Sequence, residues 1–307
     1  MTRVPAFTVS LALAAIPCAA LAQETGPVAE HAAGTDLFYQ SDADGTEVLR
    51  AGLDLDPHYR DKDNYTGLRL EKAWFNPLDQ GWQGEERVYL RASRELKDWT
   101  LKARVGTDGD TVLGSFTAFD HDRFRKEFFV ERDILETPQG LARGIYYTFA
   151  GAAIDLPVDD RNQFTLVAGA QEFTGENVRT HLRANYIHVV KPDWGLSAQL
   201  RTRFFRNSHP READYYSPRW YAQVLPVLQM RRTTDEGWRF LLAGGLGVQR
   251  DSESGWRRAS YAAGQVTSPE VAPGWAFTGG LLFTETPTAS GQSYSYFQTN
   301  IGVVRAF

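Results

Sequence analysis

Residues 301–307 read Ile-Gly-Val-Val-Arg-Ala-Phe, and their apolar side chains alternate along the chain. Phe297, Ile301, Val303 and Phe307 share one parity, so in an extended strand they lie on the same face. A closing strand with one apolar face and a final aromatic residue is typical of β-barrels that span a membrane. The C-terminal stretch therefore predicts the last strand of such a barrel.

The N-terminal residues predict secretion. Met1–Arg3 is short and basic, residues 7–20 are apolar or small, and Ala20-Leu-Ala22 fits the pattern of a signal-peptide cleavage site. We expect a signal peptide over residues 1–22, a short extension over 23–35, and a barrel over 36–307. A lipid-bearing Cys18 is the weaker alternative, because Pro17 stands where a small residue is expected.

Composition limits the function. Without the signal the chain carries 32 Lys and Arg residues, all 33 except Arg3, against 38 Asp and Glu residues. This acidic balance argues against nucleic acid as a partner. The single cysteine, Cys18, lies in the signal, so the mature chain has no disulfide and no thiolate metal site. We expect no metal, no cofactor and no catalytic residue.

The apolar runs after the signal are too short for a membrane-spanning helix, which needs about 18 residues. Trp194, Leu196, Ala198 and Leu200 instead alternate with polar residues at a period of two. A chain that spans a bilayer without helices must close into a barrel, because every backbone polar group needs an internal partner. We therefore predict an all-β fold: a closed antiparallel transmembrane barrel of about 16 strands (14 to 16) with short loops.

The alternating segments and the turn residues between them place the expected strands. Their ranges are 36–40, 46–56, 65–75, 85–96, 99–106, 111–119, 124–133, 142–156, 163–173, 178–190, 194–206, 219–231, 238–249, 255–265, 275–284 and 293–307. Tryptophans gather at segment starts and fit an aromatic belt at the membrane interface: Trp99, Trp194, Trp238, Trp256 and Trp275. A soluble β-sandwich with buried tryptophans is the alternative.

Termini in the periplasm would place residues 157–161, 191–193 and 267–269 on the periplasmic side, and residues 174–177 and 207–214 outside. None of the external connections is long, so we expect no loop that folds inward to narrow the channel.

Two short clusters resemble catalytic groups. Asp120-His121-Asp122 falls at an expected periplasmic turn, where Asp ordinarily accepts local backbone hydrogen bonds. Ser208-His209 pairs a nucleophile with a base, but neighbouring residues on a strand point to opposite faces. We interpret the first cluster as turn chemistry, and we do not expect the second to be a hydrolase site.

On the strand face that carries the polar side chains, arginine and lysine residues outnumber the acidic residues. The basic set is Arg50, Arg69, Arg91, Lys102, Arg104, Arg125, Arg179, Arg183, Arg201, Arg203 and Arg239. Two interpretations remain open: arginine and glutamate could interlock to brace the interior, or the arginines could line a basic conduit for neutral or anionic solutes.

Short motifs add a resemblance. Asp159-Asp-Arg-x-Gln-Phe-Thr-Leu166, followed by Phe173-Thr-Gly-Glu-Asn-x-Arg179, is similar to a strand–turn–strand element of exopolysaccharide-export barrels, and Tyr215-Tyr-Ser-Pro-x-x-Tyr221 is similar to another. The family is that of the poly-N-acetylglucosamine export porin and the C-terminal barrel of the cellulose synthase outer-membrane subunit. In that family a tetratricopeptide scaffold precedes the barrel, and we expect this chain to form the pore alone.

The resemblance implies a pore in the bacterial outer membrane that passes a polysaccharide outward, neutral or anionic polymers being favoured. Its expected partners are the polysaccharide and outer-membrane lipid, and they could include a periplasmic scaffold and an inner-membrane synthase. The expected sugar path consists of Arg50, Arg69, Arg104, Arg179, Arg183, Arg201, Arg203, Tyr146 and Tyr221. A small-solute channel and an outer-membrane enzyme acting on lipid or peptide are the alternatives.

Overall fold

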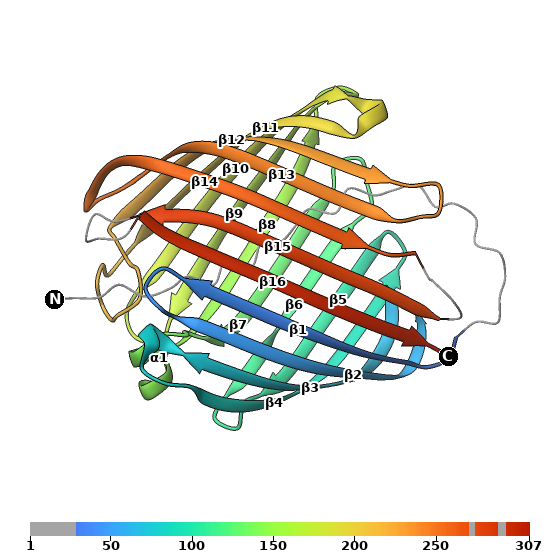
Figure 1. Ribbon diagram of the computed structural model, residues 1–307, viewed down its shortest axis with the longest axis horizontal. Helices are drawn as coiled ribbons and strands as arrows, with labels where there is room; N and C mark the ends of the chain where they lie inside the picture. The colour runs from blue at the N-terminus through green and yellow to red at the C-terminus, as the bar shows by residue number, and fades with distance from the viewer. Residues whose placement is uncertain (1–28, 270–273, 288–292) are drawn as a thin grey trace.

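The computed structural model describes residues 29–269, 274–287 and 293–307. The expected signal peptide lies outside these residues. Sixteen antiparallel strands follow one another around a closed barrel, and β1 pairs with β16 to complete the ring (Figure 1). In the part of the chain that the structure describes, no helix is long and apolar enough to cross a membrane. The prediction of a closed 16-strand antiparallel barrel is confirmed.

The strand bounds follow the expected segments closely. The strands are β1 Ala32–Asp42, β2 Glu47–Asp61, β3 Asn64–Asn76, β4 Gln83–Leu96, β5 Trp99–Thr107, β6 Val112–Asp120, β7 Lys126–Ile134, β8 Tyr146–Pro157, β9 Asn162–Phe173, β10 Val178–Lys191, β11 Leu196–Asn207, β12 Trp220–Thr233, β13 Arg239–Asp251, β14 Ser254–Thr267, β15 Trp275–Pro287 and β16 Ser293–Ala306. Two 3-10 turns, η1 Pro77–Asp79 and η2 Pro192–Trp194, follow β3 and β10. Since β1 begins at Ala32, residues 32–35 of the expected extension belong to the barrel.

One expected strand start is wrong. Residues 142–145 are not extended, because the short helix α1, Pro138–Arg143, precedes β8. Thr137 caps its N-terminus by accepting a hydrogen bond from the Gly140 amide, and Gly144 ends it in the left-handed region at φ 64°. A threonine cap, a proline in the first turn and a glycine after the last residue form a helix signature that short segments can carry.

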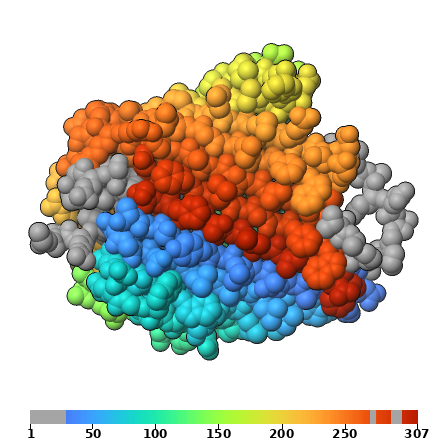
Figure 2. Space-filling view, in the orientation of Figure 1, coloured from blue at the N-terminus to red at the C-terminus, as the bar shows by residue number. Residues whose placement is uncertain are grey.

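Lipid-facing and inward-facing residues alternate as the strand period requires. The outer surface carries large exposed apolar side chains, among them Leu90, Leu246 and Ile301, which are 67%, 62% and 65% exposed. Their neighbours in sequence point inward and are glycines or carry polar groups, such as Gly245, Arg91 and Asn300. Figure 2 shows this outer wall as a continuous surface over the first and last strands. An apolar exterior around a polar interior is the pattern of a transmembrane barrel.

The two ends of the barrel differ. The end where β1 begins and β16 finishes is called the terminal end, and the opposite end, which carries α1, is called the distal end (Figure 1). Strand alternation places residues 158–161 and 192–195 at the terminal end, and residues 174–177 and 208–219 at the distal end, in agreement with the expected grouping. Trp99 and Trp275 begin their strands at the terminal end, as a belt there requires.

Candidate lumen path and its distal constriction

The inward face of β1–β5 is braced by ion pairs. Arg69 reaches three carboxylates: Asp36 at 2.5 Å, Asp54 at 3.1 Å and Glu71 at 3.0 Å. Arg91 pairs with Asp54 as well. Because each guanidinium already has carboxylate partners, these arginines support the wall, and little of their charge remains for a passing solute. The bracing interpretation holds for this side of the barrel.

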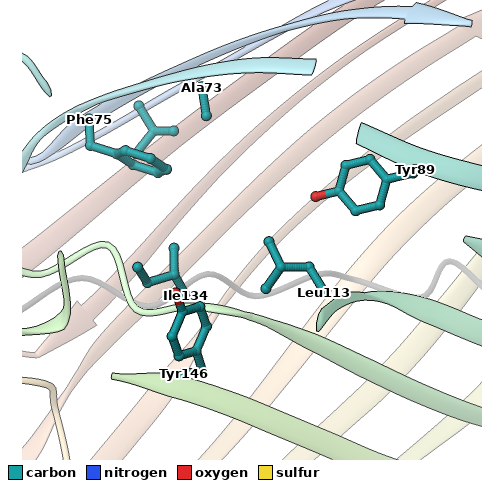
Figure 3. Packing of buried hydrophobic residues seen from close by; sticks show 7 residues of the cluster. Ala73, Phe75, Tyr89, Leu113, Ile134 and Tyr146 are labelled. Atoms are coloured by element: carbon teal, nitrogen blue, oxygen red, sulfur yellow. The ribbon is translucent and has the colours of Figure 1, made fainter. Parts of the chain in front are cut away.

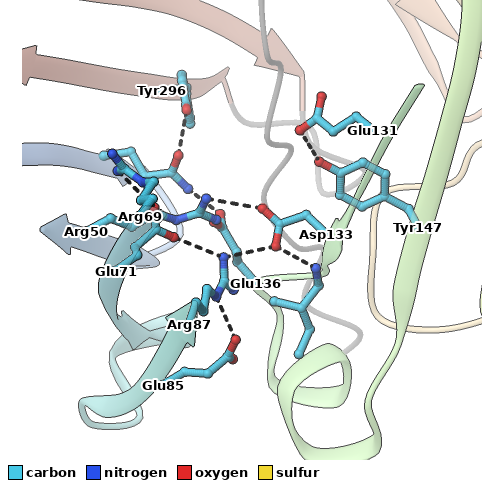
Figure 4. A network of polar contacts seen from close by, with 12 residues as sticks. Arg50, Arg69, Glu71, Glu85, Arg87, Glu131, Asp133, Glu136, Tyr147 and Tyr296 are labelled. Atoms are coloured by element: carbon cyan, nitrogen blue, oxygen red, sulfur yellow. Dashed lines mark hydrogen bonds and ion pairs between the residues drawn. The ribbon is translucent and has the colours of Figure 1, made fainter. Parts of the chain in front are cut away.

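A second ion-pair network ties a distal connection to the same wall. Arg50 on β2 contacts Asp133 at 3.1 Å and Glu136 at 2.6 Å, and Arg87 on β4 contacts Asp133 at 3.1 Å (Figure 4). The Gln40 side chain also donates to Glu136. Glu136 belongs to the connection between β7 and β8, residues 135–145, so this connection lies inside the barrel mouth.

Apolar packing anchors the two ends of this connection to the barrel wall. Ile134 and Tyr146, at its two ends, pack with Phe75, Tyr89 and Leu113 from the walls (Figure 3). These side chains are at most 7% exposed. The expectation that no connection narrows the channel is wrong: residues 135–145 are few, yet they turn inward because α1 and the ion pairs hold them there.

A second distal connection, residues 208–219, meets the first. Asp214 accepts a hydrogen bond from the Thr137 hydroxyl at 2.6 Å and one from the Gln139 amide at 2.8 Å. Burial raises the pKa of Glu136 above its usual value, and the positive charge of Arg50 opposes that rise. The two connections together form a constriction held by a few polar contacts.

The inward face of β9–β14 differs from the braced side. Arg183 on β10 and Arg203 on β11 are direct cross-strand partners, and Arg201 follows on the same face. The Arg203 guanidinium lies 5.8 Å from the Tyr221 ring, and that of Arg201 lies 4.8 Å from the Tyr261 ring. Among the residues described, none of these three arginines has an ion pair with a carboxylate. We call Arg183, Arg201, Arg203, Tyr221 and Tyr261 the basic-aromatic face.

Arg179 has a different role from its neighbours. It is fully buried, donates to Asn207 Oδ1 at 2.9 Å and to the Tyr216 carbonyl at 2.5 Å, and lies against Phe173 and Phe205. These contacts fix the 208–219 connection to the barrel wall. The side chain therefore positions the constriction and is not accessible from the interior of the barrel.

Two recesses open along the braced side. One, about 420 Å³, lies beneath the 135–145 connection and is lined by residues that include Phe75, Glu85, Asp110, Arg143 and Tyr146. The other, about 230 Å³, is lined by residues that include Tyr65, Arg91, Lys102, Arg104, Ser115 and Thr117. Arg104 lies 4.9 Å from the Tyr89 ring and has no carboxylate ion pair within the described part of the chain.

The structure separates the expected path residues into three groups. Arg50 and Arg69 are ion-paired, and Arg179, Tyr146 and Tyr221 are buried. Arg104, Arg183, Arg201 and Arg203 face the interior without carboxylate ion pairs in the segments described. Sequence reasoning missed Glu136, Asp214 and Tyr261. The two-residue period of its strand would have placed Tyr261 on the inner face.

The two catalytic-looking clusters have structural partners. Asp120 bonds to Lys126 at 2.8 Å, and His121 to Thr100 at 2.8 Å. At the distal rim Ser208, His209 and Glu176 converge, with Ser208 Oγ 3.3 Å from His209 Nδ1.

This convergence does not activate the serine. His209 Nδ1 lies closer, at 2.9 Å, to the Glu176 carbonyl oxygen, which only accepts hydrogen bonds. That nitrogen must therefore carry the proton and cannot take one from Ser208, which itself accepts from the Val178 amide at 2.8 Å.

No protein-family model and no curated protein matches the sequence. The chain is similar in structure to a protein described as a bacterial polysaccharide outer membrane secretin, with a TM-score of 0.68, 11% identity, and coverage of 90% of this chain and 98% of that one. OccAB3 of Acinetobacter baumannii has a TM-score of 0.45 at 11% identity, and the anion-selective porin of Comamonas acidovorans has 0.38 at 13%; each covers 90% of this chain and 98% of its own.

At 11% identity, the likeness to the secretin is a likeness of fold. The chain has the fold of a transmembrane β-barrel, closed and apolar on its outer surface.

Proposed function

We propose that this barrel is an outer-membrane pore through which a polysaccharide leaves the cell, with the termini in the periplasm and the constriction at the cell surface. The observation that carries the proposal is the basic-aromatic face, where arginines without carboxylate ion pairs in the described chain lie against aromatic rings. The partly buried Tyr261 ring suits the apolar face of a sugar ring, and guanidinium groups suit its hydroxyls and acid groups, while the buried Tyr221 ring holds Arg203 in place. The similarly folded polysaccharide secretin is consistent with this proposal.

The contrast between the two walls supports the same proposal. A wall needed only for stability would neutralise its charges, as Arg69 does with its three carboxylates. The arginines of the basic-aromatic face keep their charge, which in a narrow pore acts on solutes through incomplete screening. We therefore propose a neutral or anionic polymer, delivered by an inner-membrane synthase with the help of a periplasmic scaffold.

The constriction favours a second candidate, a small-solute channel, because inward connections narrow such pores. The two candidates differ in what must move. A polymer needs the 135–145 connection to leave the mouth, and this connection is held largely by side-chain contacts that can break and reform. A small-solute channel would work with the connection in place.

Efflux from proteoliposomes separates these candidates. Vesicles that contain the purified barrel are loaded with fluorescent linear oligosaccharides of increasing length, and release is followed over time. We expect release of long linear chains but retention of branched dextran of equal mass, because only a linear chain is thin enough. Release limited to mono- and disaccharides would instead establish a small-solute channel, and shortened chains in the released fraction would establish an enzyme.

A further inference from the structure

Two arginines face each other on the inner wall without the counter-charge that such a pair requires. Arg183 and Arg203 are direct partners in the β10–β11 register, which places their Cβ atoms about 5 Å apart on the same face. Like charges at this spacing destabilise a sheet. A wall that keeps both of them therefore needs a negative group from another source.

The surrounding residues do not supply that group. The inward cross-strand neighbour of Arg183 on β9 is Val167, and that of Arg203 on β12 is Gln223. The Nε atoms of both are buried without a hydrogen-bond partner in the described chain. Arg69 on β3, seven strands from β10 around the barrel, has three carboxylates for a single guanidinium.

Aromatic packing fixes the position of the pair. The Arg203 guanidinium lies 5.6 Å from the Phe205 ring and 5.8 Å from the Tyr221 ring, and these two rings stack on each other at 4.9 Å. A guanidinium held over aromatic rings keeps its planar donor fork in one orientation. Arg201, the next residue on this face, adds a third positive charge.

We infer that Arg183 and Arg203 form a binding subsite for a carboxylate, and that the polymer which this pore passes carries acidic sugar residues. A carboxylate between two guanidiniums receives charge-assisted hydrogen bonds from both and removes their mutual repulsion. The inference rests on the proposed export function and narrows its substrate to uronic-acid-type chains. Chloride alone would neutralise the pair but would not use the planar geometry of the forks.

Binding to the detergent-purified barrel tests the subsite directly. Isothermal titration at low ionic strength compares trigalacturonate with its methyl ester, which has the same chain length and no charge. We expect the ester to bind at least ten-fold more weakly. Binding of trigalacturonate should weaken at least ten-fold in Arg183→Gln/Arg203→Gln and stay unchanged in Arg60→Gln/Lys62→Gln, which removes two charges from the exposed β2–β3 turn.

Charge-retaining variants guard against a folding defect. Arg183→Lys/Arg203→Lys keeps both charges but loses the forks, so binding should weaken less than in the glutamine variant and become more salt-sensitive. Heat-modifiable mobility on gels confirms that each variant is a folded barrel. Equal binding of acid and ester, or full binding in the folded glutamine variant, would overturn the inference.

The two proposals fail separately. If long neutral chains leave the proteoliposomes and the barrel shows no preference for the acid over its ester, the export function is supported and the carboxylate subsite is refuted. If trigalacturonate binds through the arginine pair but no long chain is released, the carboxylate subsite is supported and the export function is refuted.

Discussion

The guanidinium of Arg50 on β2 donates to the carboxylate of Glu136, 2.6 Å away, and so joins the β7–β8 connection to a strand five positions along the sheet. Both side chains are largely shielded from water, Glu136 being 2% exposed. This contact reaches across the mouth of the barrel. The width of the mouth therefore depends on an ion pair that a single substitution can break.

Loss of this ion pair should widen the pore. Arg50→Gln removes the guanidinium that both Glu136 and Asp133 contact. Removing one partner of a buried ion pair destabilises the folded arrangement by about 3–5 kcal/mol. We expect the connection to leave the mouth and single-channel conductance in planar bilayers to rise. Arg125→Gln is the control, because Arg125 pairs with Glu127 near the terminal end. Equal conductance in the wild type and Arg50→Gln would show that the ion pair does not hold the constriction.

The same contact predicts a pH dependence. Burial raises the pKa of Glu136 above that of a solvated glutamate, so the carboxyl binds its proton more tightly when the connection is docked than when it is undocked. Docking of the 135–145 connection is therefore most favourable at a pH below the pKa of the solvated Glu136 carboxyl. It weakens as the pH rises through the raised pKa that this carboxyl has in the docked state. Conductance should increase over this interval, and Glu136→Gln should remove the Glu136 step. A fall in conductance over the same interval would contradict this sign.

Asp214 should control whether the two distal connections stay together. Asp214→Ala removes the acceptor for the Thr137 hydroxyl and the Gln139 amide, and hydrogen bonds to a charged group contribute about 1.5–3 kcal/mol. Limited trypsin digestion should then cut faster after Arg143. Asp193→Ala, in the exposed turn η2, should leave the cleavage rate unchanged. An unchanged rate in Asp214→Ala would show that other contacts hold α1.

Ion selectivity should follow the basic-aromatic face. The wild-type barrel should favour anions at low salt, and Arg201→Glu/Arg203→Glu should weaken or reverse that preference, because these charges act in a confined space. Reversal potentials across a salt gradient measure the effect. Arg60→Glu/Lys62→Glu, in an exposed turn, should change it less. Cation preference in the wild type would overturn the basic conduit.

Neighbouring residues on β11 should label differently. Leu200 points outward and is 42% exposed to the lipid side, whereas Arg201 lies over Tyr261 inside the barrel. Of two single cysteine variants, Leu200→Cys and Arg201→Cys, only the second should react with a membrane-impermeant thiol reagent. Equal reaction would mean a shifted register, since a one-residue shift exchanges the two faces.

Sequence by itself determined the closed barrel, a strand number of 14 to 16 and the face on which each side chain lies. The alternation of Leu196, Ala198 and Leu200 with polar residues has the period of a strand, and this local pattern needs no knowledge of distant contacts. The positions of Arg201 and Arg203 on the inner face followed from the same period. Turn residues set the strand ends to within a few positions, except at β8, where the short helix α1 interrupts the pattern.

Only the tertiary structure decided which inward arginines are neutralised. Arg69 and Arg203 both lie on the inner face and carry the same charge. The pairing of the strands places three carboxylates around Arg69, but it places a second arginine, Arg183, beside Arg203. The constriction was equally hidden, because Arg50 and Glu136 are 86 residues apart and meet only when the barrel closes. Side-chain period is a local property of the chain, whereas the pairing of charges across a lumen depends on the barrel's closure and register.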